Sequence, residues 1–135
     1  MKNIFRIFIF LLITISCKAQ SQLDTLNYLK QFEANKSQYV NKPFSYLLSH
    51  MTQMQPTSHW ASSPFTNKKV VEYSQFNFCG MEYSFKNAVT LYIIWQDNFP
   101  KSDVEYLQNK NEYYFTNEEK AFYSNKIVKD IIVRK

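Results

Sequence analysis

The stretch AVTLYIIW, residues 88–95, decides the fold. Its side chains alternate between two faces, as they do on every β-strand. A strand with one strongly apolar face is half buried, so the stretch predicts a strand that lies on the core of a sheet. One face carries Val89, Leu91, Ile93 and Trp95, and the other carries Ala88, Thr90, Tyr92 and Ile94.

Other segments predict neighbours for this strand. Residues 70–78 are rich in β-branched and aromatic side chains, and residues 127–133 are expected to form a last strand near the end of the chain. Residues 57–61, between Pro56 and Pro64, fit either a loop or a short edge strand, because proline is tolerated only at sheet edges. Most of the expected strands are grouped together and the expected helices lie mostly at the two ends of the chain, which favours an antiparallel sheet with helices on one face.

Two helices are expected before the sheet. The sequence Ser21-Gln22-Leu23-Asp24 has the form of a capping box and predicts a helix over residues 22–36. Pro43 is suited to be the first residue of a second helix. Each segment has a helical apolar stripe: Leu23, Leu26, Leu29 and Phe32 in the first, and Phe44, Leu47, Leu48 and Met51 in the second.

Two short helices are expected after the central strand. Residues 102–105, just after Pro100, and residues 116–119 both have the capping-box pattern, and the second helix should reach about residue 124. Gly80, the only glycine, is expected at a turn or bulge with a positive φ. Overall the sequence predicts one α+β domain over residues 20–135, with an N-terminal helical hairpin packed on an antiparallel sheet, short C-terminal helices and a final strand.

Residues 1–19 resemble a secretory signal peptide. Lys2 and Arg6 precede a nine-residue apolar run, residues 7–15, which is too short to span a membrane. Cleavage after Ala19 fits the small residues there and would leave a periplasmic or extracellular chain of 116 residues from the 135. The alternative is lipid attachment at Cys17, which would make the chain an outer-membrane lipoprotein and is the only basis for membrane association.

Removal of the leader changes the charge of the chain. The whole chain has sixteen basic residues, and cleavage would remove three of them: Lys2, Arg6 and Lys18. The mature chain would keep thirteen basic and eleven acidic residues, so its net charge would be close to neutral. The remaining basic residues are scattered, so no nucleic-acid partner is expected. Cys79 has no disulfide partner under either form of processing. An exported domain of this kind must be stabilised by its core, and its many aromatic residues suit that role.

The candidate catalytic residues are few. A single glycine excludes the phosphate-binding loops and the nucleophile elbow that require several. Cys79 with His59 or His50 would be a thiol–imidazole pair, but an unpaired cysteine is usually a small buried hydrophobe. The two histidines have no third ligand in register, so neither a metal nor a cofactor is expected.

The carboxylates give no acid–base pair by spacing. Asp24, Glu105 and Glu119 are assigned to capping boxes. Hydrolytic chemistry would need carboxylates that converge from distant segments, and the candidates for that role are Glu72, Glu82, Asp97 and Glu112.

Aromatic side chains are the best binding candidates. On an exposed sheet face they stack on sugars or anchor a protein partner, although core packing and cross-strand pairing also account for aromatics in strands. Trp60 is the strongest because its flanks are polar, and the full set is Trp60, Tyr73, Tyr83 and Tyr92.

The leader ending in Ala-Gln, the stretch KPFSYLL at residues 42–48 and the stretch FYSNKIVKDI at residues 122–131 resemble uncharacterised small exported proteins of Bacteroidota. This resemblance implies export and no activity. The order of elements is also similar to that of envelope interaction modules such as the outer-membrane assembly lipoprotein and the β-lactamase-inhibitor folds, an analogy that carries no function. The expected function is a non-enzymatic, exported protein-interaction domain, inhibitor-like or immunity-like. The alternative is a small envelope hydrolase that uses Cys79 with His59 or converging carboxylates.

Overall fold

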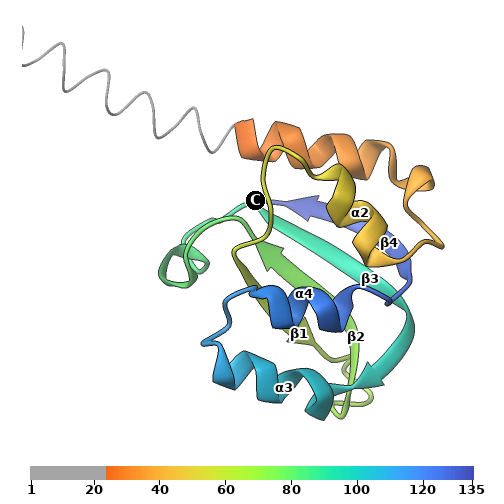
Figure 1. Cartoon of the computed structure of the whole chain (residues 1–135), viewed down its shortest axis with the longest axis vertical. Helices are drawn as coiled ribbons and strands as arrows, with labels where there is room; N and C mark the ends of the chain where they lie inside the picture. The colour runs from red at the N-terminus through yellow and green to blue at the C-terminus, as the bar shows by residue number, and fades with distance from the viewer. Residues whose placement is uncertain (1–23) are drawn as a thin grey trace, which may run out of the picture.

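The computed structural model describes residues 24–135 (Figure 1). Four strands form one antiparallel sheet in the order β1-β2-β3-β4, so that each strand pairs with the next one along the chain. The α+β class predicted from the sequence is confirmed. The strands are β1 (Ser58–Ser62), β2 (Val70–Asn77), β3 (Thr90–Pro100) and β4 (Val128–Arg134).

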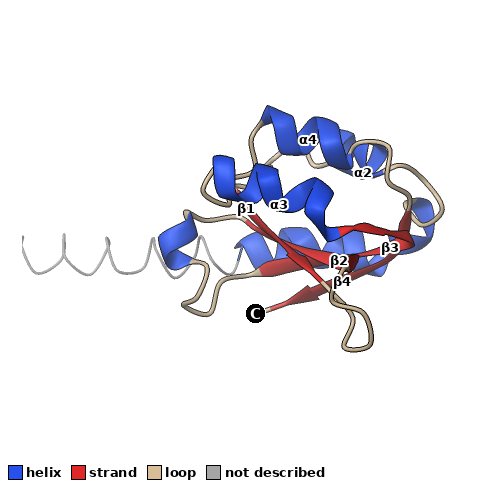
Figure 2. Cartoon of the chain, turned by 90° about the horizontal axis from the view of Figure 1, so that it is seen from below, coloured by secondary structure: helices blue, strands red, loops and turns tan. Residues whose placement is uncertain are grey.

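The helices lie unevenly about this sheet. Figure 2 shows α2, α3 and α4 on one side of it, and we call the other side the open face. A further helix occupies residues 24–34 and precedes the short turn η1. The named helices are η1 (Lys36–Gln38), α2 (Phe44–His50), η2 (Met81–Tyr83), α3 (Lys101–Lys110) and α4 (Asn117–Tyr123).

The core lies between the sheet and the helices. The alternation predicted for residues 88–95 is confirmed, because Leu91, Ile93 and Trp95 are almost completely buried on the helix side. Trp95 stacks on Tyr123 of α4 with ring centroids 5.3 Å apart. A buried serine satisfies the polar atoms of both rings: Trp95 Nε1 donates to Ser74 Oγ at 3.0 Å, and Ser74 Oγ donates to the Tyr123 hydroxyl at 3.3 Å.

Both edges of the sheet are covered along part of their length. On β4, the Val133 amide donates to Glu33 Oε1 at 2.9 Å, and the Asn41 amide donates to the Val128 carbonyl at 2.8 Å. On β1, the His59 amide donates to the Tyr113 carbonyl at 3.0 Å. Coverage of this kind blocks pairing with a strand from another chain.

Two strand predictions are sharpened by the structure. Residues 57–61 contain an edge strand rather than a loop, since β1 pairs with β2 from Ser58 to Ser62. The central strand β3 continues past Trp95 to Pro100, five residues beyond its predicted end. In this stretch the ladder to β2 is irregular between Val71 and Tyr73, and residues 96–98 are polar and exposed, so the alternation of residues 88–95 ends at Trp95.

The capping predictions have different outcomes. The Thr116 capping box is confirmed, with Thr116 as N-cap of α4. The Ser102 box is wrong: α3 begins at Lys101, directly after Pro100, and no side chain caps it. Ser102 is therefore already helical and cannot adopt the extended backbone of an N-cap. Pro43 is likewise the N-cap of α2 rather than its first residue. The proposed box at residues 21–24 begins outside the described residues.

The prediction for Gly80 is also wrong. Its φ is −57° and its ψ is 152°, an extended conformation that any residue adopts. Its lack of a side chain matters for another reason, since a Cβ there would lie 2.7 Å from Glu82 Oε1. The described residues with positive φ are instead Asn41, Asn87, Glu112 and Tyr113.

The expected leader, residues 1–19, and Cys17 lie outside the described residues. Within residues 24–135, none of the helices has the length and apolar character that a membrane span requires.

Candidate functional site

A row of side chains crosses the open face at the middle of the sheet. Trp60 of β1 lies opposite Gln75 of β2, Gln75 opposite Tyr92 of β3, and Tyr92 opposite Ile132 of β4. All four are only partly buried, in contrast to the buried residues on the other side of the same strands. No helix among α2, α3 and α4 covers this row, so it remains accessible (Figure 2).

A second row strengthens the aromatic character of the open face. Tyr73 lies opposite Ile94. The rings of Tyr73 and Tyr92 are 6.2 Å apart between centroids, within the range of a favourable aromatic pair. Arg134, at the end of β4, places its guanidinium carbon 6.0 Å from the centre of the Tyr92 ring. Three of the four predicted binding residues, Trp60, Tyr73 and Tyr92, thus share one face.

Two shallow hollows adjoin each other on this face, and Tyr92 lines both. We call the first, of about 210 Å³, the Arg134 hollow; its lining is Tyr73, Tyr92, Ile94, Ile132 and Arg134. We call the second, of about 320 Å³, the Trp60 hollow; its lining is Trp60, Gln75, Asn77, Ser84, Phe85, Thr90 and Tyr92. The first joins carbon-rich walls to one positive charge, and the second joins aromatic rings to neutral polar groups.

Trp60 is held between two other rings. Tyr113, from the connection between α3 and α4, stacks on it with centroids 4.2 Å apart and an interplanar angle of 26°. Phe85, from the loop between β2 and β3, meets it edge-on at 5.5 Å. The ring of Trp60 is therefore held in place by aromatic contacts with Tyr113 and Phe85.

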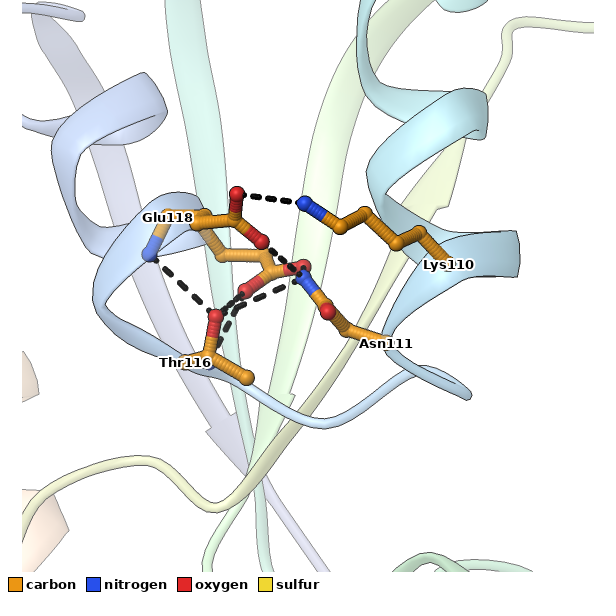
Figure 3. Close-up of polar contacts among 5 residues, drawn as sticks. Lys110, Asn111, Thr116 and Glu118 are labelled. Carbon is orange, nitrogen blue, oxygen red and sulfur yellow. Dashed lines mark hydrogen bonds and ion pairs between the residues drawn. The ribbon is translucent and has the colours of Figure 1, made fainter.

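A polar network fixes the connection that carries Tyr113 (Figure 3). Glu119 accepts hydrogen bonds from the amide of Thr116 at 2.9 Å, from the Thr116 hydroxyl, and from Asn111 Nδ2 at 2.7 Å. Lys110 Nζ reaches Glu118 Oε1 at 2.7 Å and ties the end of α3 to the start of α4. Burial alone would raise the pKa of Glu119, but the hydrogen bonds from Thr116 and Asn111 hold it below its usual range.

The structure does not bring Cys79 and His59 into a catalytic pair. His59 pairs with Phe76 on β2, whereas Cys79 follows the end of that strand. Burial, together with the negative charge of Glu82, raises the pKa of the Cys79 thiol. A thiol with a raised pKa holds little thiolate at neutral pH, the opposite of what a nucleophile needs.

His59 is a core residue with no access to solvent. It is fully buried among Phe76, Phe115 and Tyr123, and neither ring nitrogen has a hydrogen-bond partner among the described residues. Burial lowers its pKa to about 4, against smaller opposing effects from Glu119 and from the Tyr113 backbone. At neutral pH it is therefore an uncharged packing residue. His50 is exposed on α2, with its Nδ1 2.8 Å from the Tyr46 carbonyl.

The candidate carboxylates are spread over the exposed surface. Glu72 lies on β2, Glu82 on η2, Asp97 in the irregular part of β3, and Glu112 after α3. Glu82 accepts a weak hydrogen bond from the Tyr114 hydroxyl at 3.4 Å. Among residues 24–135, no group of three or more His, Cys, Asp and Glu side chains is placed to hold a metal ion.

One predicted binding residue, Tyr83, lies away from the open face, and several residues of the open face were not predicted from the sequence. Tyr83 is exposed on η2 and lines neither hollow. Ile132 and Arg134 were missed, although their separation by two residues in the final strand places them on one face. Ile94 and Phe85 were missed as well. Only the strand register shows that Ile132 lies opposite Tyr92.

Comparison of the chain with family models, with characterised proteins and with solved structures gives no significant match.

Proposed function

We propose that the chain is an exported, non-enzymatic domain that binds another protein through the open face of its sheet. Its specific form is an inhibitor or immunity protein, whose partner is a secreted enzyme or toxin. The observation that carries this proposal is the convergence of Trp60, Tyr73 and Tyr92 on one uncovered face with two adjoining hollows. Trp, Tyr and Arg are the residues that most often dominate binding energy at protein interfaces.

The construction of this face supports a recognition role. Trp60 is fixed by Tyr113 and Phe85, and a pre-positioned aromatic anchor loses little conformational entropy on binding. Exposed apolar surface of this kind on a monomer commonly marks an interaction site. The covered parts of the sheet edges favour a partner that docks onto the face rather than one that adds a strand.

The sequence of residues 1–19 supports the proposal of export, with cleavage before Gln20 as the preferred form. The intact mass of the protein purified from the cells that make it tests this proposal. A chain that begins at Gln20 supports cleavage, a diacylated chain that begins at Cys17 supports the lipoprotein form, and an unprocessed chain contradicts export.

We further propose that the helix over residues 24–34 and α2 form the expected hairpin and support the sheet from the side opposite the open face. Buried Leu29 and Phe44 support this arrangement. In this proposal the hairpin stabilises the binding face but does not contact the partner.

A capture experiment with matched variants tests the docking proposal. The mature protein is immobilised and exposed to envelope and culture extracts of the producing cells, next to the variants Ile132→Lys and Trp60→Ser. Tyr106→Ser is the control, because Tyr106 is exposed on α3, away from the open face. Loss of a central anchor costs about 2 kcal/mol or more, which is roughly a 30-fold loss of affinity.

Capture supports the proposal only if both open-face variants lose the partner and Tyr106→Ser keeps it. Thermal unfolding of each variant shows whether a loss arises from unfolding. Capture that is equal for all variants, or absent for the wild type, contradicts the proposal. If the captured partner has no enzymatic or toxic activity that the protein suppresses, the inhibitor form is wrong.

The hydrolase alternative has less support. It requires a reactive Cys79, whose thiol pKa is raised, and an accessible His59, whose ring is fully buried.

A further inference from the structure

The Arg134 hollow combines a largely apolar lining with a single charged side chain. Its walls are the side chains of two isoleucines and two tyrosines, and its single charged residue is Arg134. No carboxylate lines it. An occupant that matches this lining carries an apolar group and one negative charge close together.

The guanidinium of Arg134 is available to such a charge. The ion pairs within residues 24–135 are Lys30–Glu33, Lys36–Asp130 and Lys110–Glu118, and none of them includes Arg134. Asp130, the acidic residue on the same strand, is engaged by Lys36 at 2.6 Å. An arginine stays charged at any relevant pH and offers paired donors that match a carboxylate.

The size of the hollow limits what enters it. At about 210 Å³ it is smaller than the roughly 300–1,000 Å³ of sites that enclose a whole small ligand. It suits one large side chain of a polypeptide. The Val133 amide of β4 is already bonded to Glu33, which disfavours the addition of a strand along this part of the β4 edge.

We infer that the Arg134 hollow binds the C-terminal residue of the partner polypeptide. The apolar side chain of that residue packs on Ile94 and Ile132, and its α-carboxylate accepts two hydrogen bonds from Arg134. A C-terminal residue carries the apolar side chain and the carboxylate on one Cα, so a single residue satisfies both parts of the lining. An internal acidic residue would need a second residue to supply the apolar group. This inference rests on the proposed function, since it names the part of the partner that the open face recognises.

The adjoining hollow gives the direction of the bound chain. Tyr92 lines both hollows, so the residues before the C-terminus pass over Tyr92 towards Trp60. The lining of the Trp60 hollow is neutral, with the amides of Gln75 and Asn77 among aromatic rings. Uncharged residues are therefore expected at those positions of the partner.

Three synthetic peptides test the inference by titration of the isotope-labelled protein in NMR spectra. One is an acetylated Gly-Ser peptide that ends in phenylalanine with a free carboxylate. The second is the same peptide with a C-terminal amide. The third ends in an amide and carries phenylalanine and glutamate at internal positions. Each is added to the wild type, to Arg134→Gln and to Lys129→Gln, the last being the control because Lys129 is an exposed cation of β4 outside the hollow.

The expected result is millimolar binding of the free-carboxylate peptide, with shifts centred on Tyr92, Ile132 and Arg134, and at least tenfold weaker binding of the other two peptides. One charge-assisted bidentate contact supplies a difference of about that size. Arg134→Gln should remove the difference, and Lys129→Gln should keep it. The inference is overturned if the three peptides bind equally, if none shifts these residues at millimolar concentration, or if Arg134→Gln leaves the difference unchanged.

Capture of the partner separates this inference from the proposed function. If Ile132→Lys loses the partner while Arg134→Gln retains it undiminished, the open face still binds protein and the C-terminal recognition is wrong. If both variants retain it, the proposed function fails as well.

Discussion

The ring of Tyr113 stacks on the ring of Trp60, with the two centroids 4.2 Å apart, although the backbone of Tyr113 has a φ of 64°. Residues other than glycine and asparagine rarely adopt this conformation. The preceding residue, Glu112, also has a positive φ, of 51°. The connection between α3 and α4 is thus held in an unfavourable backbone conformation. The ring of Tyr113 in this connection packs on Trp60 of the open face. Such a conformation persists because the surrounding contacts, above all the Glu119 network, determine it.

Glu112→Gly should stabilise the protein by about 0.5–1 kcal/mol. Glu112 is exposed, and its left-handed backbone conformation costs an L-residue roughly 1–2 kcal/mol, which glycine avoids. Part of this gain is lost because glycine has a greater chain entropy in the unfolded state. Urea unfolding measures the change. Glu105→Gly, an exposed glutamate within α3, is the matched control and should destabilise by about 1 kcal/mol. Equal destabilisation by both variants would contradict the assigned backbone conformation.

Thr116→Ala should lower the free energy of unfolding by about 1–2 kcal/mol. The substitution removes the N-cap of α4 and one of the hydrogen bonds to buried Glu119. Ser102→Ala should change it by less than about 0.5 kcal/mol, since the Ser102 hydroxyl does not cap α3 and makes one long hydrogen bond, to Asp103 at 3.4 Å. Comparable losses in the two variants would mean that both sequence patterns form capping boxes, against the structure.

Stability should fall as the pH drops from about 6.5 to about 4, because of His59. Its pKa in the folded chain is about 4, against 6.5 for a free histidine, so the unfolded state takes up a proton in this range and the folded state does not. The full loss is about 3 kcal/mol. The lowered pKa values of Glu33, Glu119 and Asp130 act in the same direction as the pH falls through the ordinary values of 4.5 for glutamate and 3.8 for aspartate, so they add to the loss at the acid end of this range.

Unfolding in urea across this pH range checks the histidine effect. His59→Leu should flatten the dependence, because leucine takes up no proton and leaves no buried nitrogen without a partner. His50→Gln, which removes an exposed histidine, is the matched control. A wild type whose stability is constant between about pH 7 and pH 4.5 would show that His59 titrates normally and is not buried.

Cys79 should react with an alkylating reagent more slowly than a free thiol at neutral pH, and faster after denaturation. Burial and the charge of Glu82 both raise its pKa, which reduces the reactive thiolate. Glu82→Gln removes one of these causes and should raise the rate, whereas Glu72→Gln, at an exposed position on β2, should not. A rate for the folded wild type above that of a free thiol would instead favour the hydrolase alternative.

Local patterns predicted much of this structure. The alternation at residues 88–95 gave the central strand and its buried face, because one strand determines its own periodicity. The Thr116 capping box was predicted correctly because all of its contacts lie within four residues. The same short-range pattern failed at Ser102, where Pro100 pairs with Val70 and passes directly into α3. That pairing joins residues thirty positions apart, which no local motif records.

The candidate site was predicted only in part for the same reason. Tyr73 and Tyr92 were recognised as aromatic candidates from their strands, but the register that brings Ile132 and Arg134 beside Tyr92 depends on the whole sheet. The contact between Tyr113 and Trp60 depends on a connection in which Glu112 and Tyr113 have positive φ. Neither residue is a glycine, so the sequence does not indicate this backbone conformation.

Photo-crosslinking in the producing cells tests whether the open face of the sheet binds another protein. A benzoylphenylalanine residue replaces Ile132 on the open face in one protein and Tyr106 on α3 in another. A discrete adduct with a second protein is expected from position 132 and none from position 106, with the adduct reduced about 30-fold or more by the additional substitution Trp60→Ser. An adduct of equal yield from both positions, or one formed only from position 106, would contradict the proposal that this face binds the partner.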